Sequence, residues 1–323
     1  MAAILPSRRT VLRTCLAAAV PALHGEAAKP VVALARDPQL RAGLATPDSA
    51  RLLALLDRAV QAVYNSDSAL AAWKQVARPD EVVGLKVNCL AGRGSASTSP
   101  KVVEAVCERL QQAGVPAGHI VIWDRLTADL ERAGFHPSTA AGRIRVMGND
   151  ELGYENELAV FGSAGSLLAR NLTRLCDCVV NLSVLKDHGI VGVTMALKSF
   201  FGAIHNPNKY HSDAGNPYVA DVFMLPPIRQ KVRLHLCEAI TPQYEGGPSF
   251  MPQWSWPFNG VLASRDPVAL DATGWHILER QRAQRGMPSL RSARREPVYI
   301  ITAADPAHRI GVCDPAGILV REV

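Results

Sequence analysis

Strand-like runs alternate with helical patterns along most of the chain, and this alternation constrains the fold more than any other feature. Runs rich in valine, isoleucine and leucine lie at residues 81–88, 119–124, 143–147, 178–185, 232–240, 259–264 and 297–303. Two amphipathic patterns between them begin with a capping residue and a proline, at Ser99-Pro100 and Asp266-Pro267. This order predicts an α/β fold, with a mainly parallel mixed sheet and helices on both of its faces.

Two connections, residues 205–217 and 241–259, are longer than the usual links between strands and helices. Long connections in such folds often form binding loops or lids. We therefore expect both to lie over the carboxyl edge of the sheet.

The first 27 residues carry a pattern of their own. Arg8 and Arg9 precede a short alanine- and leucine-rich run that ends in small residues near Ala27. This resembles a twin-arginine signal peptide, and the apolar run is too short to span a bilayer. The alternative is an ordinary amphipathic N-terminal helix. We expect residues 1–27 to be a signal peptide and residues 28–323 to be a single α/β domain. The mature form would be periplasmic and free of the membrane, with the twin-arginine translocase as its partner during export.

Composition narrows the classes of partner and cofactor. With 48% hydrophobic residues, the chain can bury a large core, and its net charge of +6 is spread along the sequence, which does not favour nucleic-acid binding. The seven cysteines include no C-x-x-C pair, so neither a zinc ribbon nor an iron–sulphur cluster is expected. The loop after the first predicted strand has Gly92 and Gly94, but it has Ser97 where a dinucleotide fingerprint needs a third glycine, which argues against an NAD site.

Polar residues follow several predicted strands at the point where each strand ends. Lys86 and Asn88 follow the first run, Asp124 the second, and Lys186 and His188 the fourth. In open α/β sheets, ligands bind just outside the carboxyl ends of the strands. We therefore expect these groups to converge on one edge of the sheet.

The stretch "VGVTMALKSFFGAI", residues 191–204, places polar groups inside a strongly apolar segment. Read as a helix, it puts Thr194 and Lys198 on one face, turned back toward Lys186 and His188. A buried ammonium is costly unless it meets a carboxylate, carbonyl groups or a bound anion. Two lysines beside hydroxyl groups at a helix start would suit a carboxylate or phosphate.

These observations define a candidate site. The predicted catalytic residues are His188, Lys198 and Lys186, with His188 as the proton-transferring group. The predicted substrate-binding residues are Lys86, Asn88, Ser97, Thr98, Thr194, His211 and Asp124. A structural alternative stays open for each residue taken alone, such as an ion pair between Lys198 and Asp271 or Glu238.

A divalent metal is also left open, since mixed nitrogen and oxygen ligands are available. The candidate ligands are His188, His211, Glu245, Asp266 and Asp271. No close pair of histidines supports them, so the pattern indicates a metal only weakly.

Several motifs in fixed order resemble one family. They run from about residue 81 to about residue 278 and read "VGLKVN", "STSPKVVEAV", "CDCVVNLSVLKDH", "TMALKSFFG", "EGGP" and "ASRDPVALD". Together they are similar to the family known as domain of unknown function 362. The resemblance implies a shared pocket without naming its chemistry. Some members carry a ferredoxin-like cluster, for which this chain lacks the cysteines, and Glu238 stands where many relatives carry an aspartate.

A more distant similarity, offered as analogy only, is to nickel-pincer lactate racemases. These have a strand ending in a histidine, a glycine-rich turn, a lysine ten positions on and a later histidine. His188, Lys198 and His211 follow that order, but Thr194 and Met195 stand in place of the turn. Covalent attachment of such a cofactor is therefore not expected.

Two functions remain open from the sequence. One is an exported enzyme that acts on a small anionic substrate, a carboxylate or phosphate, with or without a metal. The other is a periplasmic protein that binds an anion or a metal without catalysis.

Overall fold

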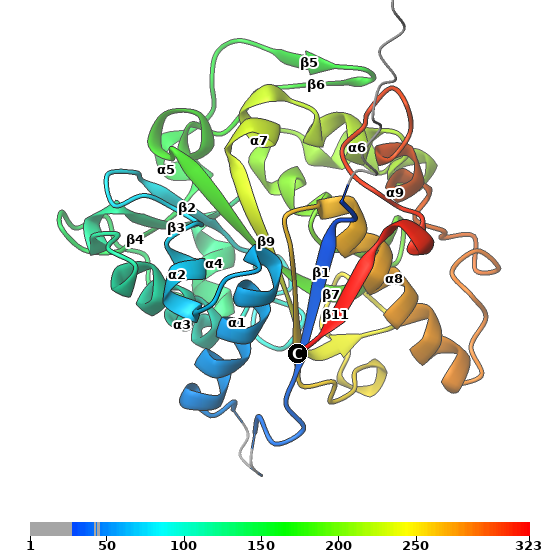
Figure 1. Ribbon diagram of the computed structural model, residues 1–323. Coiled ribbons are helices and arrows are strands. Elements are labelled where there is room, and N and C mark those ends of the chain that lie inside the picture. The colour runs from blue at the N-terminus through cyan, green and yellow to red at the C-terminus, as the bar shows by residue number, and fades with distance from the viewer. Residues whose placement is uncertain (1–27, 42, 44–45) are drawn as a thin grey trace, which may run out of the picture.

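The computed structural model describes residues 28–41, 43 and 46–323, so the predicted signal peptide lies outside the described residues (Figure 1). The strands are β1 Val31–Arg36, β2 Val83–Lys86, β3 Ile120–Asp124, β4 Arg145–Gly148, β5 Ala159–Phe161, β6 Ala164–Ser166, β7 Cys178–His188, β8 Gly192–Thr194, β9 Val232–Gln243, β10 Gly260–Ser264 and β11 Leu319–Glu322. The α-helices are α1 Ser49–Tyr64, α2 Ala69–Trp73, α3 Pro100–Gln112, α4 Thr127–Ala133, α5 Asn149–Leu152, α6 Tyr218–Phe223, α7 Pro226–Lys231, α8 Pro267–Gln284 and α9 Val298–Ala303. Two short helical segments matter for the site, η3 Lys198–Ala203 and the kinked η4 Pro207–Gly215.

One large mixed sheet forms the centre of the molecule. Its strand order is β11-β1-β10-β9-β7-β2-β3-β4, and β8 pairs with β7 outside this path. Strands β9, β7, β2, β3 and β4 run parallel to one another, whereas β10 is antiparallel to both β9 and β1. The predicted α/β class with a mainly parallel mixed sheet is therefore confirmed.

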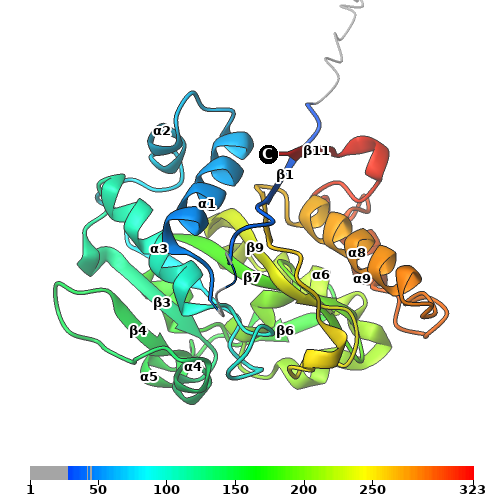
Figure 2. The same cartoon turned by 90° about the horizontal axis from the view of Figure 1, so that it is seen from below.

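Helices cover both faces of this sheet and close two hydrophobic cores. Apolar side chains of α1, α2 and α3 pack in one core, and those of α6, α8 and α9 pack in the other. In Figure 2, α1 and α3 lie on one side of β7 and β9, and α8 and α9 lie on the other. Because both faces are covered, every residue of β7 is buried. No helix within the described ranges is long and apolar enough to cross a membrane.

The two helices predicted from capping signals begin where the signals place them. The Ser99 hydroxyl accepts a hydrogen bond from the Lys101 N–H at the start of α3, with Pro100 in the first turn. The Asp266 carboxylate accepts from the N–H groups of Val268 and Ala269 at the start of α8.

Six of the seven predicted strands are confirmed, and one is wrong. Residues 298–303 form helix α9 instead of a strand. Tyr299, Ile300 and Ala303 are its buried residues, at the spacing of one helical face, while Val298 and Ile301 are exposed. A short β-branched run does not distinguish these two outcomes.

The predicted helix over residues 191–204 is also wrong. The chain forms β8, which pairs antiparallel to the end of β7, and then the 3₁₀ turn η3. Tertiary hydrogen bonds compete with the helix here, because the Asp271 carboxylate accepts from the N–H groups of Ala196 and Leu197. The Tyr299 hydroxyl also donates to the carbonyl of Val193.

Candidate functional site

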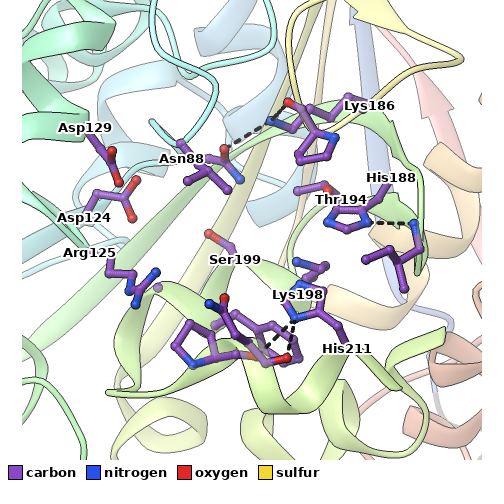
Figure 3. Close-up of a pocket in the computed structure, with 18 of the residues that line it drawn as sticks. Asn88, Asp124, Arg125, Asp129, Lys186, His188, Thr194, Lys198, Ser199 and His211 are labelled. Carbon is purple, nitrogen blue, oxygen red and sulfur yellow. Dashed lines mark hydrogen bonds between the residues drawn. The ribbon is translucent and has the colours of Figure 1, made fainter. Parts of the chain in front are cut away.

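A cavity of about 620 Å³ lies at the carboxyl ends of the parallel strands β2, β3 and β7. The two long connections close it, through Pro207 and Asn208 on one side and Gly247 and Pro248 on the other. Their predicted place over the carboxyl edge is therefore confirmed. The predicted site residues that line the cavity are Lys86, Asn88, Asp124, Lys186, His188, Thr194, Lys198 and His211. Figure 3 shows Lys186, His188, Thr194, Lys198 and His211 on one side and Asp124, Arg125 and Asp129 on the other.

Lys86 and Asp124 form an internal ion pair at the ends of β2 and β3. The Lys86 ammonium donates to the Asp124 carboxylate over 2.7 Å and to the carbonyl of Val87 over 2.6 Å. The second carboxylate oxygen of Asp124 accepts from the Cys89 N–H. Both side chains are buried, so this pair joins two strand ends and leaves little of either charge for a ligand.

Lys186, at the end of β7, is held by oxygen atoms without a negative charge. Its ammonium donates to the carbonyl of Ala96 over 2.5 Å, to that of Pro248 over 3.2 Å and to the amide oxygen of Asn88 over 3.4 Å. These bonds use all three of its N–H donors. Burial lowers the pKa of Lys186 to about 8. Lys186 therefore places positive charge beside the cavity but has no donor left for a ligand.

Lys198, at the start of η3, differs from both. Its side chain is only 9% exposed, and its ammonium lies 4.8 Å from the centre of the Phe201 ring. Within the described residues it has no hydrogen bond or ion pair. Burial first, and then the charge of Lys186, lower the pKa of Lys198 to about 7. Of the three cavity lysines in the described part of the chain, only Lys198 has all of its donors free.

The hydrogen bonds of His188 define its neutral form. Its Nδ1 accepts from the N–H groups of Ile190 and Val191, at 3.1 and 3.3 Å, so the proton lies on Nε2. Burial, followed by the charges of Lys198 and other neighbours, lowers the pKa of His188 to about 2. His188 is thus a neutral hydrogen-bond donor, and this geometry favours it less as a proton acceptor.

His211 has the opposite tautomer. Its Nδ1 lies 3.1 Å from the carbonyl oxygen of Pro207 and 3.3 Å from that of Asn208, so Nδ1 carries the proton and Nε2 a free electron pair. Burial and the charge of Lys198 lower the pKa of His211. The His188 and His211 rings stack with their centres 5.5 Å apart. The site therefore pairs a neutral donor with a neutral acceptor.

Two buried hydroxyl groups at the cavity have no partner. Thr194 Oγ1 and Ser199 Oγ make no hydrogen bond to any described residue, although both residues line the cavity. Buried polar groups are normally paired, so these two indicate that the cavity holds a polar ligand or water.

Ser97 and Thr98 are not brought to the cavity. The Thr98 hydroxyl accepts from the Asn88 N–H and donates to the carbonyl of Leu182, which ties their loop to β7. Ser97 is buried nearby, and its hydroxyl makes no hydrogen bond within the part of the chain that the structure describes. Both serve the loop beneath the site, and neither lines the cavity.

The five candidate metal ligands do not come together. Glu245 binds Arg282 and Arg295, Asp271 holds the backbone of residues 196–197, and Asp266 caps α8. Asp266 follows β10, and because β10 is antiparallel to β9 its end lies at the opposite edge of the sheet. Only His188 and His211 of this set line the cavity. Among the described residues, no group of three or more histidines, cysteines and carboxylates could hold a metal ion.

Sequence reasoning missed four polar residues of the cavity wall, namely Arg125, Asp129, Ser199 and Asn208. Arg125 directly follows β3, so the rule that found Asp124 applies to it as well. Asp129 is buried in the first turn of α4, where it binds Arg132. Asn208 lies on the long connection, where no periodic pattern marks a site.

Comparison with known proteins gives one family and a remote structural likeness. Residues 83–276 match the family described as "Domain of unknown function (DUF362)". No curated protein matches the chain. Among solved structures, it is similar to the lactate racemase apoprotein from Thermoanaerobacterium thermosaccharolyticum, with a TM-score of 0.43 and 11% sequence identity. That likeness covers 71% of this chain and 55% of the racemase chain, so the chain spans just over half of the racemase's length.

Proposed function

The chain belongs to the DUF362 family, as its motifs indicated, and from that premise we propose that it is an enzyme acting on a small substrate that carries a carboxylate or phosphate. The family itself names no reaction. The proposal therefore depends on the chemistry of the cavity.

The observation that carries the proposal is the Lys198 ammonium. It is buried, lines the cavity and lacks an internal counter-ion within the described residues. A buried charge without a partner is costly, and a bound anion would remove that cost. The unpaired hydroxyls of Thr194 and Ser199 add two further groups that a polar ligand would satisfy.

The two stacked histidines supply the reaction. His211 Nε2 takes a proton from the substrate, and His188 Nε2–H donates a hydrogen bond to the oxygen that gains negative charge. Proton transfer by a neutral imidazole is efficient near neutral pH. The two tautomers do not allow these roles to be exchanged, because His188 Nε2 already carries a proton and His211 Nε2 does not.

Anion binding is tested by calorimetry with acetate and with inorganic phosphate, at about pH 6.5 where Lys198 is largely charged. Lys198→Met should weaken binding about tenfold to a hundredfold, because it removes hydrogen bonds between charged groups. Lys101→Met is the matched control, since Lys101 is exposed on α3. Equal affinity of the wild type and Lys198→Met would rule out Lys198 as the anion ligand.

Catalysis is tested by proton exchange, which does not require knowledge of the product. In deuterated water, NMR should show that the wild-type protein catalyses the exchange of a carbon-bound proton for deuterium in a small carboxylic acid that it binds. His211→Gln should bind the same acid without exchanging it. Binding without exchange across a panel of 2-oxo and 2-hydroxy acids would instead identify a binding protein.

We further propose that the protein reaches the periplasm by the twin-arginine route. Support comes from Arg8 and Arg9 ahead of the short apolar run. Replacing both arginines by lysine should retain a fused reporter in the cytoplasm, and unchanged export would contradict the proposal.

A further inference from the structure

Lys198 has the surroundings of a reactive amine as well as those of an anion ligand. Its Nζ lies 4.8 Å from the centre of the Phe201 ring and meets no acceptor in the described residues. The positive charge of Lys186 is close enough to lower the pKa of Lys198 further, which disfavours a second ammonium. An amine that is desolvated and placed beside another cation is the form in which lysine acts as a nucleophile.

We propose that Lys198 is a nucleophile that forms an imine with the carbonyl carbon of a small oxo acid. This rests on the proposed function, because the carboxylate of the oxo acid is the anion of that site. It adds the substrate class and a covalent step.

The other two lysines of the cavity are unsuited to this reaction. Lys86 shares its ammonium between Asp124 and the carbonyl of Val87, and Lys186 donates to three oxygen atoms. Loss of a proton from either would leave buried acceptors unpaired. Lys198 loses no hydrogen bond when it becomes neutral, and its lowered pKa, about 7, agrees with this difference.

The step balances without a further reactant. The neutral amine of Lys198 attacks the carbonyl carbon, the carbonyl oxygen accepts two protons and leaves as water, and a carbon–nitrogen double bond remains. One of those protons comes from the amine and one from solvent. The second amine proton stays on the nitrogen, so the product is an iminium with one positive charge. The iminium keeps a positive charge at the position of the ammonium, so the adjacent carboxylate keeps its counter-ion.

Neighbouring groups fit this step. His188 Nε2–H can donate to the carbonyl oxygen under attack, because its Nδ1 is already occupied by backbone N–H groups. His211 Nε2 has a free electron pair for a proton next to the iminium carbon, which the iminium makes more acidic. The unpaired Thr194 and Ser199 hydroxyls are available to the carboxylate.

The test is reductive trapping on the full chain. Protein is incubated with pyruvate and sodium cyanoborohydride, which reduces an iminium to a stable amine, and intact mass and peptide mapping follow. We expect the main adduct at Lys198. It should form at least about tenfold faster than any adduct at the exposed Lys101. Acetone, which lacks the carboxylate, should give little or no adduct under the same conditions.

Lys198→Arg separates the covalent step from anion binding. Arginine keeps the charge but cannot lose its proton, so this variant should still bind acetate and should give no adduct. Lys198→Met should lose both acetate binding and the adduct, and Lys101→Met should keep both. Mapping of the wild-type adduct does not depend on the folding of any variant.

Each result decides between the two proposals. Acetate binding without an adduct at Lys198 overturns the imine and leaves the proposed anion site intact. Neither binding nor adduct overturns both. Equal trapping of acetone and pyruvate, or equal labelling of Lys101 and Lys198, overturns the oxo-acid nucleophile.

Discussion

At the scale of single residues, the structure assigns different roles to two histidines that look alike in the sequence. His188 is fixed as a donor by the N–H groups of Ile190 and Val191, and His211 as an acceptor by the carbonyls of Pro207 and Asn208. The backbone groups next to each ring determine which of its nitrogens carries the proton. Such a choice depends on backbone positions two to four residues away and could not be predicted from residue identity.

The tautomers give a spectroscopic prediction. Nitrogen-15 NMR should show His188 protonated at Nε2 and His211 protonated at Nδ1. Because burial lowers both pKa values, His188 should stay neutral from about pH 5 to 8 and His211 should gain its proton only below the ordinary histidine range. Assignment by His188→Gln and His211→Gln identifies the signals. Identical tautomers, or a His188 that titrates near 6.5, would contradict the assigned roles.

At the scale of elements, one carboxylate holds the segment that carries Lys198. Asp271, on α8, accepts from the N–H groups of Ala196 and Leu197 at 2.8 and 3.0 Å. Asn181, on β7, donates to the carbonyl of Ala196. The turn between β8 and η3 is thus fixed from two elements at once.

Replacing Asp271 with Asn should loosen this turn. The amide oxygen of asparagine can still accept from one of the two backbone N–H groups, but its NH₂ group would face the other N–H, donor against donor. We therefore expect a loss of about 1–3 kcal/mol in the free energy of unfolding. Acetate affinity should fall as well, because Lys198 is less well placed. Denaturant unfolding and calorimetry measure both, with Arg280→Gln, exposed on the same helix, as the control. Unchanged stability would show that these bonds do not hold the turn.

A second tie joins the end of β7 to the connection after β9. Arg295 binds Asp187 over 3.0 Å and also Glu245, and Asp187 accepts from the Gly247 N–H. Asp187 lies between Lys186 and His188 in the sequence and is fully buried. The pairing therefore fixes the strand end that carries both site residues.

Arg295→Met should be strongly destabilising, by about 3–5 kcal/mol, because it leaves a buried carboxylate without its counter-charge. Arg291→Met removes a neighbouring arginine that is 78% exposed and paired with Glu296, and should cost at most about 1 kcal/mol. Equal effects of the two substitutions on denaturant unfolding would contradict the structural role of Arg295.

At the scale of the whole molecule, the sequence was sufficient for the parallel part of the sheet and for the edge where the site lies. Lys86, Asp124, Lys186 and His188 converge because β2, β3 and β7 are parallel, as their order with helices predicts. The direction of β10 could not be predicted, since alternating patterns do not encode strand direction. Asp266, which follows β10, therefore lies at the edge of the sheet opposite to the cavity, not among the candidate metal ligands beside it. The short strand β1 was missed, although it begins with two valines. The partners of Lys186 also come from distant carbonyls, which no local pattern reveals.

The C-terminal part is held to the rest by a histidine whose charge depends on pH. His308 contacts Asp221, on α6, over 2.9 Å and Asp305 over 2.8 Å. Burial lowers its pKa, but the hydrogen bonds to the two carboxylates outweigh this, and the pKa is raised from 6.5. A raised pKa adds stability that is complete below 6.5 and is lost as pH rises through the value in the folded state.

His308→Gln should therefore destabilise the protein more at about pH 5.5 than at about pH 8.5. Denaturant unfolding of the variant and the wild type at both values measures this difference. An equal loss at both pH values would show that the charge of His308 does not contribute.

The central claim is that Lys198 binds a small anion. The most direct test of this claim is to titrate the Lys198 side chain. In protein with isotope-labelled lysine, assigned by Lys198→Arg, NMR should give Lys198 a pKa of about 7 in the absence of ligand. Lys186, His188 and His211 interact electrostatically with Lys198, and none of these three side chains carries a negative charge. Saturating acetate should raise the Lys198 pKa, because a bound anion stabilises the ammonium. A value near 10.5 in the free protein, or a pKa that acetate leaves unchanged, would contradict the account.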